Sequence, residues 1–126
     1  MSVNAHFSFI CFTFFIYLRQ RIQTSDMETY IEREENRATI SIKGRFTADE
    51  AQNFIKITDD LKQEQLSEIL MDLSELEFIS SAGIRCFVLM LKACEKSGTV
   101  LRMKNLTPQV REIFTLTTLI DKFNVQ

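Results

Sequence analysis

The chain has 126 residues, of which 45% are hydrophobic and 25% charged, and its formal net charge at pH 7 is −2. That length suits one domain, and that composition is typical of a soluble globular protein. Because there is no block of basic residues, the sequence gives little support to direct nucleic-acid binding. The three cysteines include no C-x-x-C pair and the single histidine is His6, so we expect neither a metal site nor another cofactor.

Residues 1–26 differ from the rest of the chain. An apolar run at 7–18 holds five of the eleven phenylalanines and is followed by Arg19 and Arg21. The run is shorter than the ~20 apolar residues of a spanning helix, and its positive charges follow it, whereas those of a secretory signal precede it. Three interpretations stay open: an upstream extension with the working chain beginning at Met27, an amphipathic or membrane-touching anchor, or a segment that packs on a partner.

A β-hairpin is predicted over residues 28–44. We expect an edge strand at 28–33 and a polar turn at 34–37. Residues 38–44 alternate apolar with polar side chains, which is the period of a half-buried strand.

A helix and a buried strand are predicted next. The helix should run from about 48 to 63, because Thr47 and Glu50 have the spacing of a capping box and apolar residues recur at helical spacing. The strand is expected at 67–73, where the continuous apolar residues 69–71 indicate that both faces of the sheet are covered.

The second half of the chain continues the alternation. A long helix is expected at 81–96, ended by Gly98, and Cys86 and Cys94 in it are expected to be small core residues in a reducing cytoplasm. A strand at 99–104 follows. Another helix should begin at Pro108 with Thr107 as its cap, and a short last strand is expected at 121–125. Strands that alternate with helices predict an α/β domain with a largely parallel sheet.

The strand-to-helix junction at residues 80–83 carries two serines before two small residues. A serine at such a place is usually a helix cap, and the spacing alone favours that interpretation. Ala82 and Gly83, however, would let another molecule approach closely, which suits a hydroxyl that a partner handles.

The same region resembles the signature of the STAS domain, the fold of bacterial anti-sigma factor antagonists. The resemblance extends over positions 72 to 84 and rests on Asp72, Leu73, Ser74, Phe78, Ile79, Ser80, Ser81, Ala82, Gly83 and Ile84. A second segment, residues 106–123, is similar to the family's Thr-Pro helix and the apolar turn after it, with Thr118 where the family often has glycine. The resemblance implies a STAS-like single domain at 27–126, with a mixed, largely parallel sheet and helices mainly on one face. Because it begins just after Met27, it favours the extension interpretation of 1–26.

The resemblance also implies a function. The serine at the position of Ser81 is the one that a partner kinase phosphorylates in the family. Unphosphorylated, such a protein binds an anti-sigma factor that is also a serine kinase; phosphorylation releases it and a serine phosphatase resets it, which regulates sigma-factor-dependent transcription. We therefore expect a cytoplasmic phosphoprotein, with a membrane role left open only by residues 1–26.

The expected partner-binding surface consists of the strand-to-helix junction and the loop that lies near it in the family. Its residues are Gly44, Arg45, Phe46, Thr47, Ser80, Ser81, Ala82, Gly83 and Arg85. Several of these have a plainer interpretation: Thr47 and Ser80 as helix caps, and Ala82 and Gly83 as close-packing residues. Ser80 stands where many family members have aspartate, and Arg85 is expected to be an exposed helix residue.

Catalysis has no candidate residues in the predicted domain. No histidine lies within 27–126, so there is no nucleophile–base pair, and three glycines in the whole chain cannot supply a glycine-rich phosphate loop. The chain is therefore expected to be no enzyme. Two alternatives to the antagonist remain: a non-switching STAS scaffold subunit of a lipid-transport ATPase or other transporter complex, and, more weakly, a nucleotide or small-ligand sensor.

Overall fold

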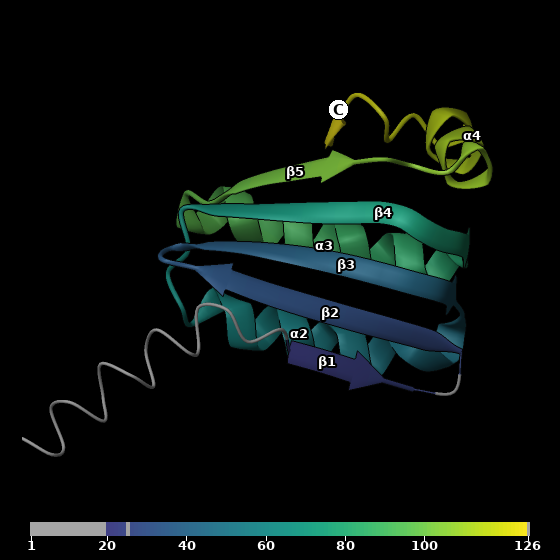
Figure 1. The fold of residues 1–126 in the computed structure, drawn as a ribbon. Helices are drawn as coiled ribbons and strands as arrows, with labels where there is room; N and C mark the ends of the chain where they lie inside the picture. Colours follow the sequence, from purple (N-terminus) through teal and green to yellow (C-terminus); the bar gives the residue numbers. More distant parts are fainter. Residues whose placement is uncertain (1–19, 25, 126) are drawn as a thin grey trace, which may run out of the picture.

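The computed structural model describes residues 20–24 and 26–125, and its centre is a six-stranded sheet (Figure 1). Its elements are β1 (Gln20–Gln23), β2 (Met27–Glu34), β3 (Arg37–Phe46), the 3₁₀ helix η1 (Ala48–Glu50), α2 (Ala51–Lys62), β4 (Glu68–Ile79), α3 (Ser81–Ser97), β5 (Val100–Lys104), α4 (Pro108–Leu116) and β6 (Asn124–Val125). The strands lie in chain order across the sheet. β1–β2 and β2–β3 are antiparallel and the other three pairings are parallel, so the predicted mixed, largely parallel sheet is confirmed.

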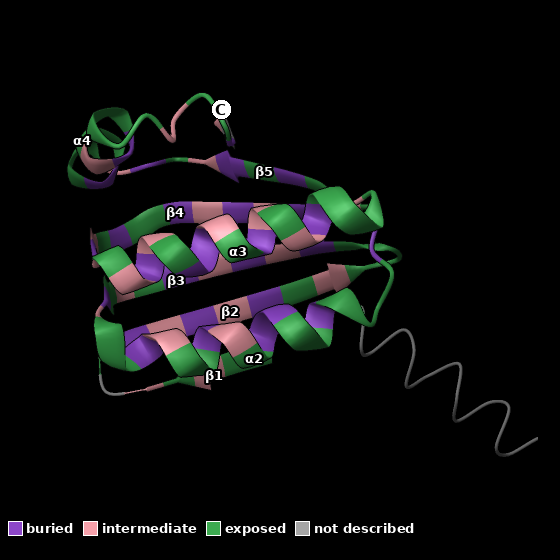
Figure 2. Cartoon of the chain, turned by 180° about the vertical axis from the view of Figure 1, so that it is seen from behind, coloured by how far each residue is buried: buried purple, intermediate pink, exposed green. Residues whose placement is uncertain are grey.

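The helices α2 and α3 lie side by side on one face of the sheet, while α4 lies past the end of β5 (Figure 2). The core between helices and sheet contains a series of phenylalanines with no exposed surface: Phe46, Phe54, Phe87 and Phe114. Their neighbouring ring centroids are 5.1 to 6.3 Å apart, in tilted or edge-to-face arrangements. The prediction of helices mainly on one face is confirmed.

The edge of the sheet differs from the prediction. We expected residues 28–33 to form an edge strand, but β1 pairs with β2 over its whole length, from Gln20 opposite Ile31 to Gln23 opposite Glu28. β1 therefore lies inside the stretch 1–26 and is part of the sheet. The apolar run at 7–18 lies outside the described residues.

β4 is longer than predicted. The sequence indicated a strand that ends near residue 73 and a short connection, whereas β4 continues to Ile79. Two register shifts against β3 each add a residue to β4, so that its buried side chains Leu73, Leu76 and Ile79 are three residues apart. These bulges break the period of two, which is why the sequence did not indicate a strand there.

Two predicted caps occupy the N-cap position, but their side chains do not form the capping hydrogen bond. Thr47 precedes η1, but its side chain makes no capping hydrogen bond, and the carboxylate of Glu50 accepts a hydrogen bond from Thr24 instead. Thr107 precedes α4, and its hydroxyl donates to the carbonyl of Leu76 at 2.9 Å, which attaches α4 to β4. The end of α3 agrees with the prediction, because Gly98 has a left-handed φ of 78°.

Candidate functional site

The predicted site begins where β4 passes into α3. Ser80 has an extended backbone, and its Oγ accepts a hydrogen bond from the N–H of Gly83 at 3.1 Å. It is therefore the N-cap of α3. Spacing alone allowed either serine to cap the helix, and in the structure Ser80 is the cap and Ser81 is not.

Ser81 is the first residue of α3, and it is exposed. Its side chain has no hydrogen bond within the part of the chain that the structure describes. The N–H of Ile84 is the first in α3 to bond back to a backbone carbonyl, that of Ser80, at 2.9 Å. The Ser81 hydroxyl thus lies in the first turn of a 17-residue helix, where backbone N–H groups lack carbonyl partners and the helix dipole is positive.

The predicted loop 44–47 lies beside this junction. β3 and β4 are parallel, with Phe46 opposite Ile79, and the N–H of Ser80 donates to the carbonyl of Phe46 at 2.8 Å. As a result η1 and α3 begin at the same edge of the sheet. The structure therefore brings both predicted halves of the surface together.

Three of the predicted partner-binding residues, Gly44, Phe46 and Gly83, allow close packing of the backbone. Phe46 and Gly83 are buried, and a Cβ on Gly83 would lie 2.9 Å from the Phe46 ring and 2.8 Å from Ile79, so only glycine lets α3 pack this closely. Gly44 has φ +102°, and a Cβ there would lie 2.4 Å from the carbonyl oxygen of Asp26. A partner at this surface would not touch the side chains of Phe46 and Gly83.

The remaining predicted residues lie at the end of β3 and the beginning of α3, and we name them together the α3 corner: Arg45, Thr47, Ser80, Ser81, Ala82 and Arg85. Arg45 precedes the buried Phe46 in β3, so its side chain lies on the face of the sheet away from the helices. Arg45, Ser81 and Arg85 are exposed and the other three are half-buried. The Arg45 guanidinium lies 4.5 Å from the centroid of the Phe78 ring, a cation–π contact that orients it. Sequence reasoning did not find this contact, because the bulges in β4 decide which face Phe78 takes.

Asp72 has a structural role away from the α3 corner. Its Oδ1 accepts from the Ser74 N–H at 3.1 Å and from the Asn105 side chain at 3.4 Å. Burial acts to raise the pKa of Asp72, but these hydrogen bonds and the charge of Lys104 outweigh it and lower the pKa below its ordinary value. The carboxylate thereby ties β4 to the chain that follows β5.

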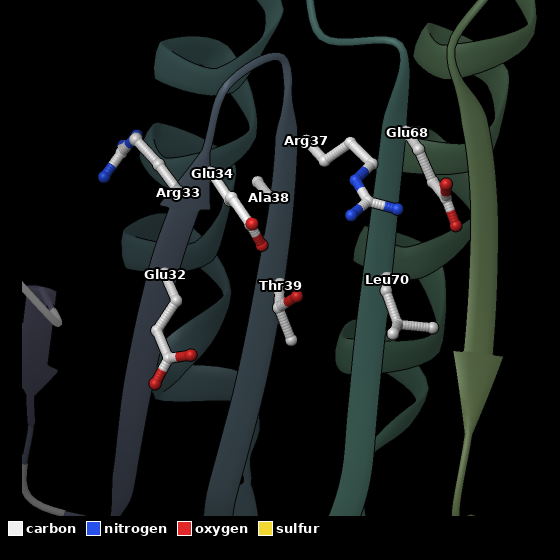
Figure 3. A pocket seen from close by; sticks show the side chains of 8 residues that line it. All are labelled: Glu32, Arg33, Glu34, Arg37, Ala38, Thr39, Glu68 and Leu70. Carbon is white, nitrogen blue, oxygen red and sulfur yellow. The ribbon is translucent and has the colours of Figure 1, made fainter. Parts of the chain in front are cut away.

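A hollow lies on the sheet face that the helices leave open (Figure 3). It encloses about 410 Å³ near the beginnings of β3 and β4, and it is lined by Glu32, Arg33, Glu34, Arg37, Ala38, Thr39, Glu68 and Leu70. Ser81 follows the opposite end of β4, which at roughly 3.3 Å per residue is more than 30 Å long. None of the predicted site residues lines this hollow.

The described residues offer little to metal or thiol chemistry. No group of three or more His, Cys, Asp or Glu side chains in residues 20–24 and 26–125 is placed to hold a metal ion. Cys86 and Cys94 are free and buried, and burial raises the pKa of both thiols, that of Cys94 to about 11. In the same described part of the chain, no helix is long and apolar enough to cross a membrane.

Comparisons with known proteins agree with this geometry. The family model described as "Mlab, STAS domain" matches residues 30–122. An anti-sigma factor antagonist from Mycobacterium paratuberculosis has a similar structure, with a TM-score of 0.72 and 19% identity over 82% of this chain and 89% of that chain. No curated protein sequence matches at a significant level.

Two further solved structures have the same fold. The Bacillus cell fate determinant SpoIIAA in its phosphorylated form has a TM-score of 0.60 and 14% identity, over 86% of this chain and 91% of that chain. A sulfate transporter family protein from Wolinella succinogenes has a TM-score of 0.65 and 17% identity, over 73% of this chain and 77% of that chain. With the family match over most of its length and the fold in agreement, this chain belongs to the STAS domain family.

Proposed function

We propose that this protein is an anti-sigma factor antagonist whose binding is switched by phosphorylation of Ser81. Unphosphorylated, it binds an anti-sigma factor with serine kinase activity through the α3 corner; phosphorylated on Ser81, it is released. The observation that carries the proposal is that Ser81 is exposed at the start of α3 while Ser80 performs the capping. A kinase can therefore reach the hydroxyl without taking apart the helix cap.

The chemistry of the first turn of α3 supports a switch that leaves the fold in place. A phosphate adds about −1.5 to −2 charge and three strong acceptor oxygens. The free backbone N–H groups and the positive end of the helix dipole favour such a charge. The Ser80–Gly83 hydrogen bond and the buried Phe46 lie outside the modified group. The same fold occurs in the phosphorylated and the unphosphorylated forms of SpoIIAA, which also supports the proposal.

Phosphorylation would weaken docking to the partner, although it leaves the fold in place. A partner surface complementary to a neutral serine would have to desolvate a phosphate with no compensating cation, which is unfavourable. Arg45 and Arg85 on the α3 corner suit carboxylates of the partner, because arginine pairs with them through a planar set of donors. A phosphate on Ser81 would compete for Arg85, which is four residues further along α3. A serine phosphatase would then restore the neutral surface.

Phosphate mapping tests the proposal. The full chain is incubated with Mg-ATP and an anti-sigma factor kinase encoded by the same organism, and the product is analysed by intact mass and peptide sequencing. We expect one phosphate on Ser81 in the wild type, none in Ser81→Ala, and one in the control Ser74→Ala, which removes another exposed serine. Unmodified Ser81, together with equal kinase binding by wild type and Ser81→Asp, would refute the switch.

The second candidate is a non-switching STAS subunit of a lipid-transport ATPase or other transporter complex. The observation that favours it is the similarity to the sulfate transporter family protein. Under this alternative the chain would co-purify in a fixed ratio with a membrane ATPase or transporter. Neither Ser81→Ala nor Ser81→Asp would change that ratio, whereas the switch predicts that Ser81→Asp loses its partner.

A further inference from the structure

We infer that the turn between β1 and β2 positions the α3 corner, through a contact between Thr24 and Glu50 that we name the Thr24–Glu50 latch. Its role in partner docking rests on the proposed function, but the latch itself can be tested without a partner. The turn follows β1 in a part of the sequence that resembles no family motif.

Glu50 is the unusual residue in this contact. It is 1% exposed, and it is the one carboxylate among the buried side chains of the described residues. Its carboxylate accepts a hydrogen bond from the Thr24 hydroxyl, which also contacts the carbonyl of Met27 at 2.9 Å. A buried carboxylate needs hydrogen-bond donors, so loss of the Thr24 hydroxyl would leave Glu50 poorly satisfied.

The same turn also holds the beginning of the loop. The carbonyl of Asp26 accepts the N–H of Arg45 at 2.9 Å, and it occupies the space that a Cβ on Gly44 would fill. The turn thus contacts the chain just before Thr47, through Asp26, and just after it, through Thr24. These contacts fix the path of the chain from β3 into η1.

The loop is held away from the arrangement that its sequence favours. Thr47 and Glu50 have the spacing of a capping box, in which the glutamate side chain reaches back to the backbone N–H of the threonine. Here Glu50 turns to Thr24, and the Thr47 hydroxyl is buried with no hydrogen-bond partner among the described residues. Opening the latch would free Glu50 to form the capping box, and that arrangement would compete with the observed one.

A change in this loop would also move the backbone next to Ser81, the proposed phosphorylation site. The carbonyl of Phe46, next to Thr47, accepts the N–H of Ser80 at 2.8 Å, and the Phe46 ring packs against Gly83. Thr24 and Glu50 are therefore positioning residues for the α3 corner: they touch no partner themselves, and they set the backbone that presents Arg45 and Ser81.

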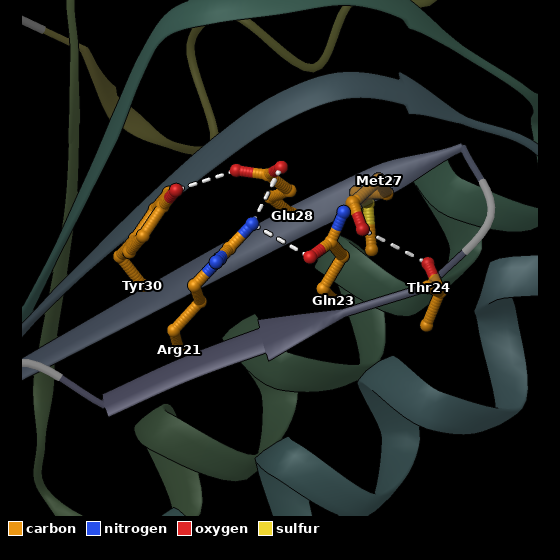
Figure 4. A network of polar contacts seen from close by, with 6 residues as sticks. All are labelled: Arg21, Gln23, Thr24, Met27, Glu28 and Tyr30. Atoms are coloured by element: carbon orange, nitrogen blue, oxygen red, sulfur yellow. Dashed lines mark hydrogen bonds and ion pairs between the residues drawn. The ribbon is translucent and has the colours of Figure 1, made fainter.

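The remainder of the hairpin provides a matched control. Arg21 in β1 donates to Gln23 at 2.6 Å and to Glu28 at 3.1 Å, and Tyr30 also donates to Glu28 (Figure 4). These groups stabilise the same two strands on an exposed surface. Replacing Arg21 should weaken the hairpin without removing a contact to the loop.

Amide hydrogen exchange on the full chain tests the latch. The variants are Thr24→Val, Glu50→Met, the control Arg21→Gln and the conservative Thr24→Ser, all compared with the amides of central β4. Methionine has a similar length to glutamate but no oxygen to accept from Thr24. We expect Thr24→Val and Glu50→Met to raise exchange at residues 44–50 and at Ser80 by about threefold or more. Arg21→Gln should leave these amides unchanged, and Thr24→Ser should restore their protection.

Unchanged exchange at 44–50 in Thr24→Val would overturn the inference, and so would an equal rise in Arg21→Gln. If Thr24→Val does not fold, the comparison of Glu50→Met with Arg21→Gln decides in the same way. In a second arm, the anti-sigma factor kinase should modify Ser81 more slowly in Thr24→Val than in Arg21→Gln. Because exchange is measured on the free protein, failure of the latch is distinguishable from failure of the proposed function.

Discussion

The two ends of the β3–β4 pair differ in what their exposed polar groups contact. At the beginning of these strands lies the open hollow, and two of its charged residues are already engaged in ion pairs: Arg33 pairs with Glu64 at 2.7 Å and Glu68 with Arg102 at 3.5 Å. At the other end two helices begin, and an exposed Ser81 lies on a rigid helix. We therefore place the proposed site at the end with Ser81, because its hydroxyl has no hydrogen bond within the described residues and lies on a 17-residue helix.

The largest effect is expected from the packing beneath the α3 corner. Gly83→Val should destabilise the fold by roughly 1–3 kcal/mol or more, because its side chain would overlap the Phe46 ring and Ile79. Urea unfolding followed by circular dichroism measures this. The control Ala82→Val changes a half-exposed neighbour and should cost much less. Equal unfolding midpoints for Gly83→Val and wild type would contradict the close packing.

The two adjacent serines should separate stability from function. Ser80→Ala removes the N-cap and should cost about 1 kcal/mol of folding free energy. Ser81→Ala should change stability by less than about 0.5 kcal/mol, since its side chain is exposed, yet it should abolish phosphorylation. Thermal unfolding and phosphate mapping of the two variants check both expectations. A larger stability loss in Ser81→Ala than in Ser80→Ala would reverse the assigned roles.

The two ends of the sheet can be compared directly by changing one arginine at each. Arg45→Ala should weaken binding of the anti-sigma factor about tenfold, because Arg45 is an exposed residue of the α3 corner whose guanidinium is held over the Phe78 ring. Arg37→Ala, in the open hollow, should leave the dissociation constant within about twofold. Titration calorimetry gives both constants. A greater loss in Arg37→Ala would place the partner at the hollow.

The smallest effect concerns Asp72. A lowered pKa means that the folded state favours the carboxylate, so its contribution to stability is present above the unfolded pKa of about 3.9 and is lost as the pH falls through the folded pKa. Asp72→Asn should therefore be slightly less stable than wild type at pH 7. The difference should shrink as the pH falls below about 3.9. If the stability difference between Asp72→Asn and wild type grew as the pH fell, the pKa of Asp72 would not be lowered in the folded state.

The elements that the sequence predicted well are those with strong local signals. The helix from Ser81 to Gly98 has a cap, an apolar face and a left-handed terminator, all close together in the chain. Thr118 illustrates a signal that the resemblance supplied, since its φ of +56° fits a position where the family often has glycine. The resemblance implied that the loop at 44–47 lies near residues 80–83, and the structure brings the two together because the parallel strands β3 and β4 end side by side.

What the sequence could not predict depends on contacts between distant residues. The bulges in β4 exist only against β3, so the strand period disappears after residue 73. Glu50 leaves its local capping box because Thr24, 26 residues earlier, offers a hydroxyl. β1 has only four residues, none of which is strongly apolar except Ile22. Tertiary pairing overrode local preference in each case.

The central claim is that a phosphate on Ser81 weakens binding of the partner and leaves the fold unchanged. The most direct measurement uses one preparation of the protein phosphorylated on Ser81. It records the melting temperature of this protein and its affinity for the anti-sigma factor that the unphosphorylated protein binds. We predict a melting temperature within about 4 °C of the unmodified protein and an affinity at least about 100-fold weaker. An unfolded phosphoprotein, or one that binds as tightly as the unmodified chain, would contradict the account.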